Sequence, residues 1–96
     1  MNKFYPTGPV TDQIRQMTKL HNFRNERLEL FETLTERELE ILTLVADGQN
    51  NPTIAKHLGI KRVTVQNHRT SIREKLNIQN DSDYIKFALA YDLIKF

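Results

Sequence analysis

Signals for the start and the end of helices stand close together in the middle of this 96-residue chain, and they limit its possible folds. Asn51 followed by Pro52 predicts a helix start, because asparagine caps well and proline is tolerated at the first helical position. Gly59 ends this helix, and the next helix begins near residue 61 or 62 and ends before Asn77. The signals therefore predict a short helix over residues 52–58, a three-residue turn that contains glycine, and a longer helix.

The small and apolar residues of these two helices fit a crossed pair. Ala55 is small enough for a close crossing, Gly59 permits the turn, and Val65 fills the angle between the helices from the far side. Ile72 and Leu76 continue the buried stripe of the longer helix. This spacing is typical of a helix-turn-helix arrangement, in which the second helix lies in the major groove of DNA.

A capping box precedes the crossed pair. Thr35 can accept the backbone N–H of Glu38, and the side chain of Glu38 can reach back to the backbone of Thr35. Leu34 and Leu39 form the matching hydrophobic staple. The box therefore predicts a helix over about residues 36–47, which the glycine that follows ends in a left-handed turn.

The N-terminal third of the chain predicts an arm and one helix. Residues 1–10 contain two prolines and a glycine and are expected to form an extended arm. Residues 11–33 space their apolar side chains mostly by three or four, which predicts an amphipathic helix capped by Thr11 or Asp12.

A last helix over about residues 81–91 is predicted by Asn80, which suits the N-cap position. The expected fold is therefore all-α, with four helices behind an extra N-terminal amphipathic helix. We expect residues 1–33 to form an arm and a linker or dimerisation helix, and residues 34–96 to form a helix-turn-helix DNA-binding domain.

Composition excludes several classes of protein. The chain has 39% apolar residues and no cysteine, so one modest core is expected, without disulfides or thiolate zinc sites. Its three histidines are scattered, and it contains no glycine-rich phosphate loop, paired carboxylate site or nucleophile motif. We therefore expect no enzyme activity, catalytic residue, metal or cofactor. Because no stretch reads as a signal peptide or membrane span, a cytoplasmic protein is expected.

Charge is distributed unevenly along the chain. Residues 50–76 carry six basic side chains and one acidic one, whereas residues 26–47 carry seven acidic and two basic ones. The basic block coincides with the predicted crossed helices. It is therefore the expected polyanion-binding face.

These residues together resemble the output domain of the LuxR/FixJ/NarL group of bacterial transcription regulators. The matching positions run from Leu34 to about Ile94, and those that carry the resemblance most strongly are Leu34, Thr35, Arg37, Glu38, Glu40, Ile41, Leu42, Gly48, Asn51, Ile54, Ala55, Leu58, Gly59, Ile60, Thr64, Val65, His68, Ile72, Lys75 and Leu76. The resemblance implies a four-helix domain that binds promoter DNA, usually as a dimer on inverted or direct half-sites. Expected partners are double-stranded promoter DNA and a second copy of the chain, with RNA polymerase as a further candidate.

Three side chains are the candidates for reading bases. On the helix predicted at about residues 62–76, Gln66, Asn67 and Thr70 face away from the apolar stripe and lie in the N-terminal half, which reaches base edges. Glutamine and asparagine pair bidentately with adenine, so a half-site with A·T pairs is expected. The resemblance places the base-facing residues of the family at these positions, where lysine is common in place of Gln66.

Phosphate contacts, which position a protein on DNA without specifying its sequence, are expected from Asn51, Thr53, Lys56, Lys61, Arg62, Thr64, Arg69 and Arg73. Arg73 and Lys75 also fit an exposed helix end. Lys61 stands where the family usually has serine or threonine as the cap of the recognition helix. We hypothesise that Lys61 makes the helix less stable than a serine or threonine cap would, but provides a phosphate contact at the helix N-terminus.

The last predicted helix carries more apolar surface than one core face needs. Ile85, Ala88 and Leu89 mark the face expected in the core, and Tyr84, Phe87 and Tyr91 form a second stripe beside it. The fourth helix of the family supplies a dimer contact, so the candidate dimer residues are Tyr84, Phe87, Ala88 and Tyr91. A wider core face is the alternative.

The alternative to DNA binding is a helical protein-interaction module that has kept the fold without the DNA contacts. Position 66 holds glutamine where lysine is common in the family, and this difference favours the alternative. Binding to duplex DNA across a series of salt concentrations distinguishes the two functions.

Overall fold

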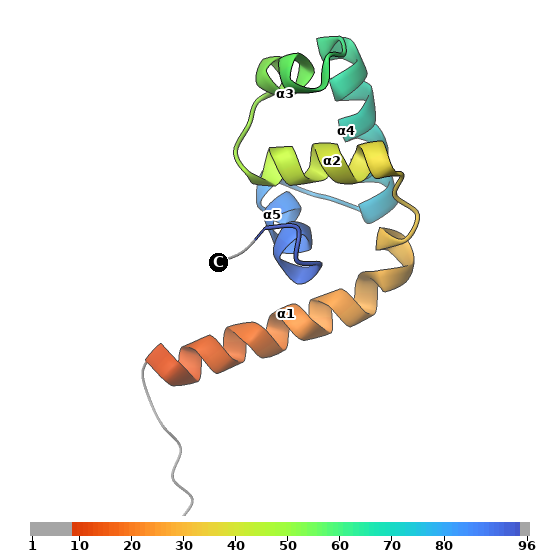
Figure 1. Ribbon diagram of the computed structural model, residues 1–96. Coiled ribbons are helices and arrows are strands. Elements are labelled where there is room, and N and C mark those ends of the chain that lie inside the picture. Colours follow the sequence, from red (N-terminus) through yellow and green to blue (C-terminus); the bar gives the residue numbers. More distant parts are fainter. Residues whose placement is uncertain (1–8, 95–96) are drawn as a thin grey trace, which may run out of the picture.

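The computed structural model describes residues 9–94, and the side chains of residues 12–94, as an all-helical fold without strands (Figure 1). The helices are α1 (Pro9–Phe31), α2 (Glu36–Ala46), α3 (Asn51–Leu58), α4 (Arg62–Leu76) and α5 (Asp81–Ala90). This arrangement confirms the predicted class, four helices behind an extra N-terminal helix. Within residues 9–94, no helix is both long and apolar enough to cross a lipid bilayer.

The helix α1 begins earlier than its sequence indicated. It starts at Pro9 and ends at Phe31, so Thr11 and Asp12 lie in its first turn and do not cap it. Proline at the first helical position explains the difference, because its fixed φ suits the helix and its missing N–H has no partner there. The rest of the predicted arm, residues 1–8, lies outside the described residues.

The capping box of α2 is present as predicted. Thr35 Oγ1 accepts from the N–H of Glu38 at 3.1 Å, and the N–H of Thr35 donates to Glu38 Oε1 at 2.9 Å. The helix ends at Ala46, one residue earlier than predicted, and Asp47 is its C-cap.

At α3, Asn50 rather than Asn51 is the N-cap. Asn50 Oδ1 accepts from the N–H of Thr53 at 3.0 Å, and Asn51 and Pro52 are the first two helical residues. The prediction was one residue late because either of two adjacent asparagines suits a cap. Gly59 ends α3 in the left-handed conformation, with φ of +66°, which makes the tight turn to α4 possible.

The core lies where α2, α4 and α5 meet, and α3 closes it beside α4. Its largest fully buried side chains are Tyr84, Ile41, Leu42, Ile54, Ile72 and Val65. Ala55 and Val65 are buried between α3 and α4, as the spacing predicted. The crossed pair is therefore held by its own apolar contacts and by α2 behind it.

Most of the side chains expected to form a dimer contact on α5 belong to the core of the chain itself. Tyr84, Phe87 and Ala88 are 0–2% exposed and Tyr91 is half-buried, whereas Ile85, expected in the core, is 43% exposed. These residues therefore offer little surface to a second copy. The alternative, a wider core face, is the arrangement found.

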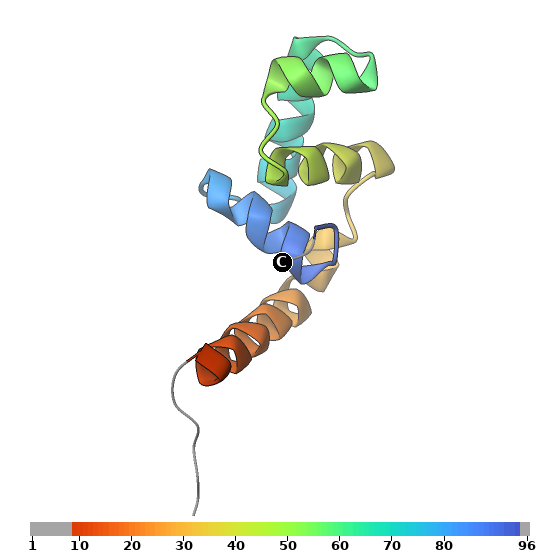
Figure 2. The same ribbon diagram turned by 60° about the vertical axis from the view of Figure 1, so that its left-hand side comes forward.

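The C-terminal half of α1 is the element that covers this face of α5 (Figure 2). The ring of Phe23 meets Phe87 edge to face with centroids 4.8 Å apart, and Phe31 stacks on Tyr91 at 3.8 Å. The hydroxyl of Tyr91 donates to the carbonyl of Arg24 at 2.6 Å. Burial raises the pKa of Tyr91, so its hydroxyl remains a donor. The second apolar stripe of α5 is thus explained by α1.

A buried ion pair ties α2 to the C-terminal half of α4. Glu38 is 3% exposed; its Oε1 lies 2.7 Å from Lys75 Nζ, and its Oε2 accepts from Ser71 Oγ at 2.6 Å. Lys75 Nζ also donates to the carbonyl of Thr33 at 3.2 Å. The prediction of an exposed helix end is therefore wrong for Lys75, which is half-buried at this contact.

The surroundings of Glu38 act on its acidity in opposite directions. Burial alone would raise the pKa of its carboxyl group, but the hydrogen bonds from Lys75, Ser71 and the Thr35 backbone, with the charge of Lys75, outweigh burial. They lower the pKa from 4.5 to about 2. The carboxylate is therefore charged in the folded protein at every pH above about 2.

We expect Glu38 to stabilise the fold in a pH-dependent way. Because its pKa is lower in the folded than in the unfolded chain, its contribution is complete above about pH 4.5 and is lost as the pH falls toward 2. The shift corresponds to about 3 kcal/mol. Urea unfolding of the wild type and of Glu38→Gln should therefore give a difference in unfolding free energy that is largest above pH 5 and shrinks toward pH 2. Glu36→Gln, an exposed change in the same turn, is the control, and a pH-independent difference for Glu38→Gln would contradict the assignment.

Candidate nucleic-acid interface

The three predicted base-reading residues lie together on an open face of α4. Gln66, Asn67 and Thr70 are all exposed. The N-terminal half of α4 and the neighbouring α3 form the end of the molecule farthest from α1 (Figure 1). Their predicted outward position is confirmed, and their contact with bases stays a prediction.

Val63 belongs to the same open face, as the helical wheel of the sequence indicates, although it was not among the expected base-reading residues. It lies in the first turn of α4 and is 61% exposed. Its position on the helical wheel, on the side of Gln66 and Asn67, was the available signal. An exposed aliphatic side chain there suits contact with the methyl group of thymine.

Four of the predicted phosphate-binding residues surround a shallow depression between α3 and the start of α4. These residues are Thr53, Lys56, Lys61 and Arg62. All four are exposed, and none of their side chains is held by an ion pair within the described residues. Thr64, by contrast, is half-buried. The depression thus collects three cationic side chains next to the base-reading face.

The start of α4 lacks a side-chain cap, as the sequence predicted. Lys61 occupies the N-cap position with extended backbone angles, and its side chain accepts no hydrogen bond from the helix. Backbone N–H groups at such an end are unsatisfied and carry partial positive charge, which favours an anion. The helix N-terminus therefore adds to the positive character of the depression.

Arg69 and Arg73 are held by other residues of the chain and do not join these cations. Arg69 is 16% exposed, lies 5.4 Å over the ring of Tyr84 and is 3.7 Å from Asp81. Arg73 donates to the Tyr84 hydroxyl at 3.3 Å and lies 3.5 Å from Asp81. Both arginines are anchored on α5, so the structure does not place them in the phosphate-binding group.

Asn51 also belongs to an internal network, although it was expected to contact phosphate. Its Oδ1 accepts from Arg69 at 2.7 Å, and its Nδ2 donates to Gln66 Oε1 at 3.0 Å. Gln66 Nε2 lies 3.5 Å from Thr70 Oγ1, which donates to the carbonyl of Gln66 at 3.0 Å. This network connects two of the base-reading residues to the first turn of α3.

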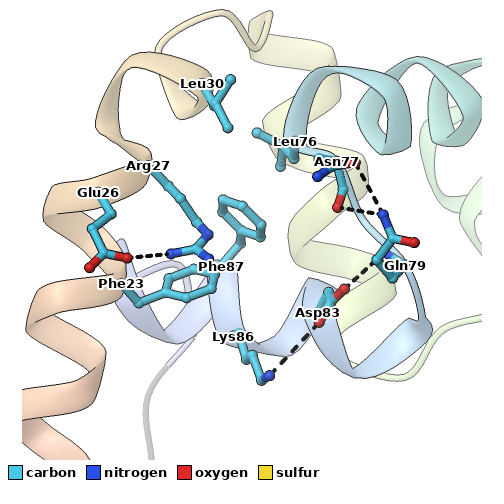
Figure 3. A pocket seen from close by; sticks show the side chains of 10 residues that line it. All are labelled: Phe23, Glu26, Arg27, Leu30, Leu76, Asn77, Gln79, Asp83, Lys86 and Phe87. Atoms are coloured by element: carbon cyan, nitrogen blue, oxygen red, sulfur yellow. Dashed lines mark hydrogen bonds and ion pairs between the residues drawn. The ribbon is translucent and has the colours of Figure 1, made fainter.

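A cleft at the opposite end of the domain has a different character. Figure 3 shows this cleft, of about 570 Å³, where α1 meets the C-terminal end of α4 and the side of α5. Its charged residues pair with each other, Arg27 with Glu26 at 3.2 Å and Lys86 with Asp83 at 3.9 Å. The cleft therefore marks the junction of α1 with the domain, and the candidate interface is the open face of α3 and α4.

Comparison with known proteins identifies a family for most of this fold. Residues 32–88 match the family described as bacterial regulatory proteins, luxR family. The matched segment contains α2, α3, α4 and most of α5. It therefore includes the whole candidate interface.

Longer relatives share the same region. Over 79 residues the chain is 39% identical to proteins named response regulator protein VraR from Staphylococcus saprophyticus, Staphylococcus aureus and Staphylococcus epidermidis. The aligned region is 82% of this chain and 38% of each relative. The chain thus spans well under half the length of these relatives.

Lys61 should show opposite effects on stability and on DNA binding. Lys61→Ser supplies the missing cap, which typically stabilises a helix by about 0.5 to 2 kcal/mol, so the melting temperature should rise by several degrees. The same change removes a cation beside the helix N-terminus and should weaken binding to duplex DNA. Thermal unfolding and a DNA titration measure the two effects, with Lys19→Ser on exposed α1 as the control. A variant unchanged in both would end the hypothesis.

Proposed function

Because the chain belongs to the luxR family of bacterial regulatory proteins, we propose that it regulates transcription by binding promoter DNA at a specific sequence. The exposure of Gln66, Asn67 and Thr70 on the N-terminal half of α4 carries this proposal. Polar side chains in this position reach base edges when a helix of this kind enters the major groove.

The proposed docking places α4 in the major groove and α3 across the DNA backbone. Lys56, Lys61 and Arg62 then lie beside the base-reading face, where they would contact phosphates and fix the position of the helix. The uncapped N-terminus of α4 points its free N–H groups to the same side. Val63 adds an apolar contact within the groove.

We further propose that the chain binds DNA as a dimer. One recognition helix contacts only a few base pairs, and proteins of this kind gain specificity by placing two helices on two half-sites. Because the apolar face of α5 is covered by α1, the interface has to lie elsewhere.

The surface proposed for the dimer is a stripe on α1. Ile14, Met17 and Leu28 are 55%, 59% and 44% exposed, and their spacing of three and eleven residues places them on one side of the helix. The N-terminal half of α1 extends away from the domain, so this stripe is accessible to a second copy (Figure 1).

A protein-interaction module is the second candidate function. The contacts of Arg69 and Arg73 with Asp81 favour it, because this carboxylate offsets one of their two positive charges within the chain. Gln66, in place of the lysine common in the family, removes a further charge from the face. DNA binding across salt concentrations decides between the two candidates.

Affinity for duplex DNA should fall steeply with salt. Three available cations in each chain make six in a dimer, so the logarithm of the binding constant should fall with the logarithm of salt concentration with a slope of about −5. Fluorescence anisotropy of a labelled promoter fragment measures this slope. A flat response would favour the protein-interaction module.

Matched variants test whether the salt dependence of DNA binding comes from the proposed DNA-binding face. Lys56→Gln should make the slope of a dimer shallower by roughly 2, since one phosphate contact is lost in each copy. Lys19→Gln, which removes an exposed cation from α1, should leave the slope unchanged. Equal effects of the two changes would contradict the proposed docking.

Substitutions in the α1 stripe should separate the dimer into monomers. Ile14→Glu combined with Met17→Glu would place carboxylates in the apolar contact and raise the dissociation constant of the dimer roughly tenfold or more. Sedimentation equilibrium measures the change, and circular dichroism checks that the helices remain. Asn22→Glu, at an exposed position on another side of α1, should leave the dimer intact. A monomeric wild type, or a double variant that still dimerises, would overturn the interface.

A further inference from the structure

A line of polar contacts runs from α5 to the base-reading face through residues far apart in the sequence. Asp81 at the start of α5 lies 3.7 Å from Arg69 Nη2, and Nη1 of the same guanidinium donates to Asn51 Oδ1 at 2.7 Å. Asn51 Nδ2 then donates to Gln66 Oε1 at 3.0 Å. Asn51 is the first residue of α3, so this line crosses from α5 over α4 to α3 and returns to α4.

The chemistry of the guanidinium fixes the direction of each hydrogen bond in this line. Arginine has only donors, so the atom of Asn51 that faces Arg69 is its carbonyl oxygen. The amide nitrogen of Asn51 therefore faces Gln66, and the atom of Gln66 that meets it is an acceptor, Oε1. An unrestrained glutamine amide can present either end, whereas here one end is held.

Arg69 is itself well fixed, which makes the direction persistent. Its side chain is 16% exposed and lies over the ring of Tyr84, which is fully buried. A planar cation that lies over an aromatic ring, donates a hydrogen bond to Asn51 and pairs with Asp81 has little freedom to turn. The orientation of Asn51 thus derives from the packing of α5 and α4.

We propose that Asn51 is a specificity-determining positioning residue, which acts by setting the hydrogen-bond polarity of Gln66. The proposal rests on the proposed function, in which Gln66 faces a base. Because Asn51 holds Oε1, Nε2 of Gln66 is the group left to donate to that base. Its contact with Thr70 Oγ1 is long, at 3.5 Å, and yields readily to a better acceptor.

With Nε2 of Gln66 as the group that donates to the base, Gln66 distinguishes among the four bases. In the major groove, guanine, adenine and thymine each present an acceptor, whereas cytosine presents only the N4 donor. Adenine fits best, because its N7 accepts from Nε2 while its N6 donates to the remaining lone pair of Oε1. The base facing Gln66 is therefore adenine in preferred sites, and cytosine is the base most strongly rejected.

Asn51→Asp tests the proposal by reversing one hydrogen bond without changing the size of the side chain. The carboxylate keeps an acceptor for Arg69 but offers Gln66 a second acceptor in place of the donor. Gln66 must then turn its Nε2 toward the introduced carboxylate and present Oε1 to the base. Oε1 accepts from the N4 group of cytosine, so the preference at that base should reverse.

The measurement is the binding of the full chain to a library of duplex sites, first selected with the wild type and then varied singly at every position. The wild type should reject cytosine at one position on the order of tenfold. Gln66→Ala should remove the preference at that position, which identifies it. Asn51→Asp should change the preference there toward cytosine by roughly fivefold or more, while its added negative charge weakens binding to all sites alike.

A double variant separates positioning from a merely structural role. In the Gln66→Ala background, Asn51→Asp should weaken all sites uniformly and alter no base preference, because the side chain through which it acts is gone. If Asn51→Asp weakens all sites uniformly with Gln66 present, or shifts a position that does not depend on Gln66, the proposal is overturned.

A second variant covers the case in which Asn51→Asp does not fold. Arg69→Met keeps an unbranched side chain over Tyr84 but removes the donors that fix the Asn51 amide, so rejection of cytosine should relax without reversing. If Arg69→Met rejects cytosine as strongly as the wild type does, the proposal is overturned. Failure of the wild type to bind duplex DNA, or binding without any base preference, would instead overturn the proposed function.

Discussion

The carboxylate of Glu38 joins α2 to α4, two helices that must keep a fixed arrangement. It caps the first turn of α2, accepts from Ser71 in α4, and pairs with Lys75 near the end of α4. Taking a charge out of water is costly unless each of its oxygens finds donors, and both oxygens of Glu38 do. The direction of α4 is thereby fixed at its C-terminal half. Its N-terminal half, supported by α3, is left free to enter a groove.

Aromatic packing between α1 and α5 makes the N-terminal helix part of the domain at one end and leaves it free at the other. Phe23 and Phe31 supply the apolar surface that α5 needs, so α5 is completed within one chain. The same helix carries exposed apolar residues farther toward its N-terminus. One element thus closes the core and, in the proposed function, also meets a second copy.

Features set by neighbouring residues could be predicted from the sequence, and features set by distant ones could not. The capping box at Thr35 and the outward position of Gln66 depend on a few adjacent residues or on helical periodicity, and both are found. The cap of α3 was misplaced because Asn50 and Asn51 are locally equivalent. The contacts that cover Phe87 and Tyr91 could not be predicted, because they require knowing that α1 packs back on α5. The polar network of the interface, likewise, joins residues from three helices.

The contact between Asp81 and Arg69 gives a residue of α5 influence over the recognition face. Asp81 takes no place in the groove in the proposed docking, yet it restrains the guanidinium that orients Asn51 and, through it, Gln66. In a gene family that expands by duplication, two regulators could then keep identical α4 sequences and diverge in their operators through a change on α5. Grouping such proteins by their recognition helices alone would assign them the same targets wrongly.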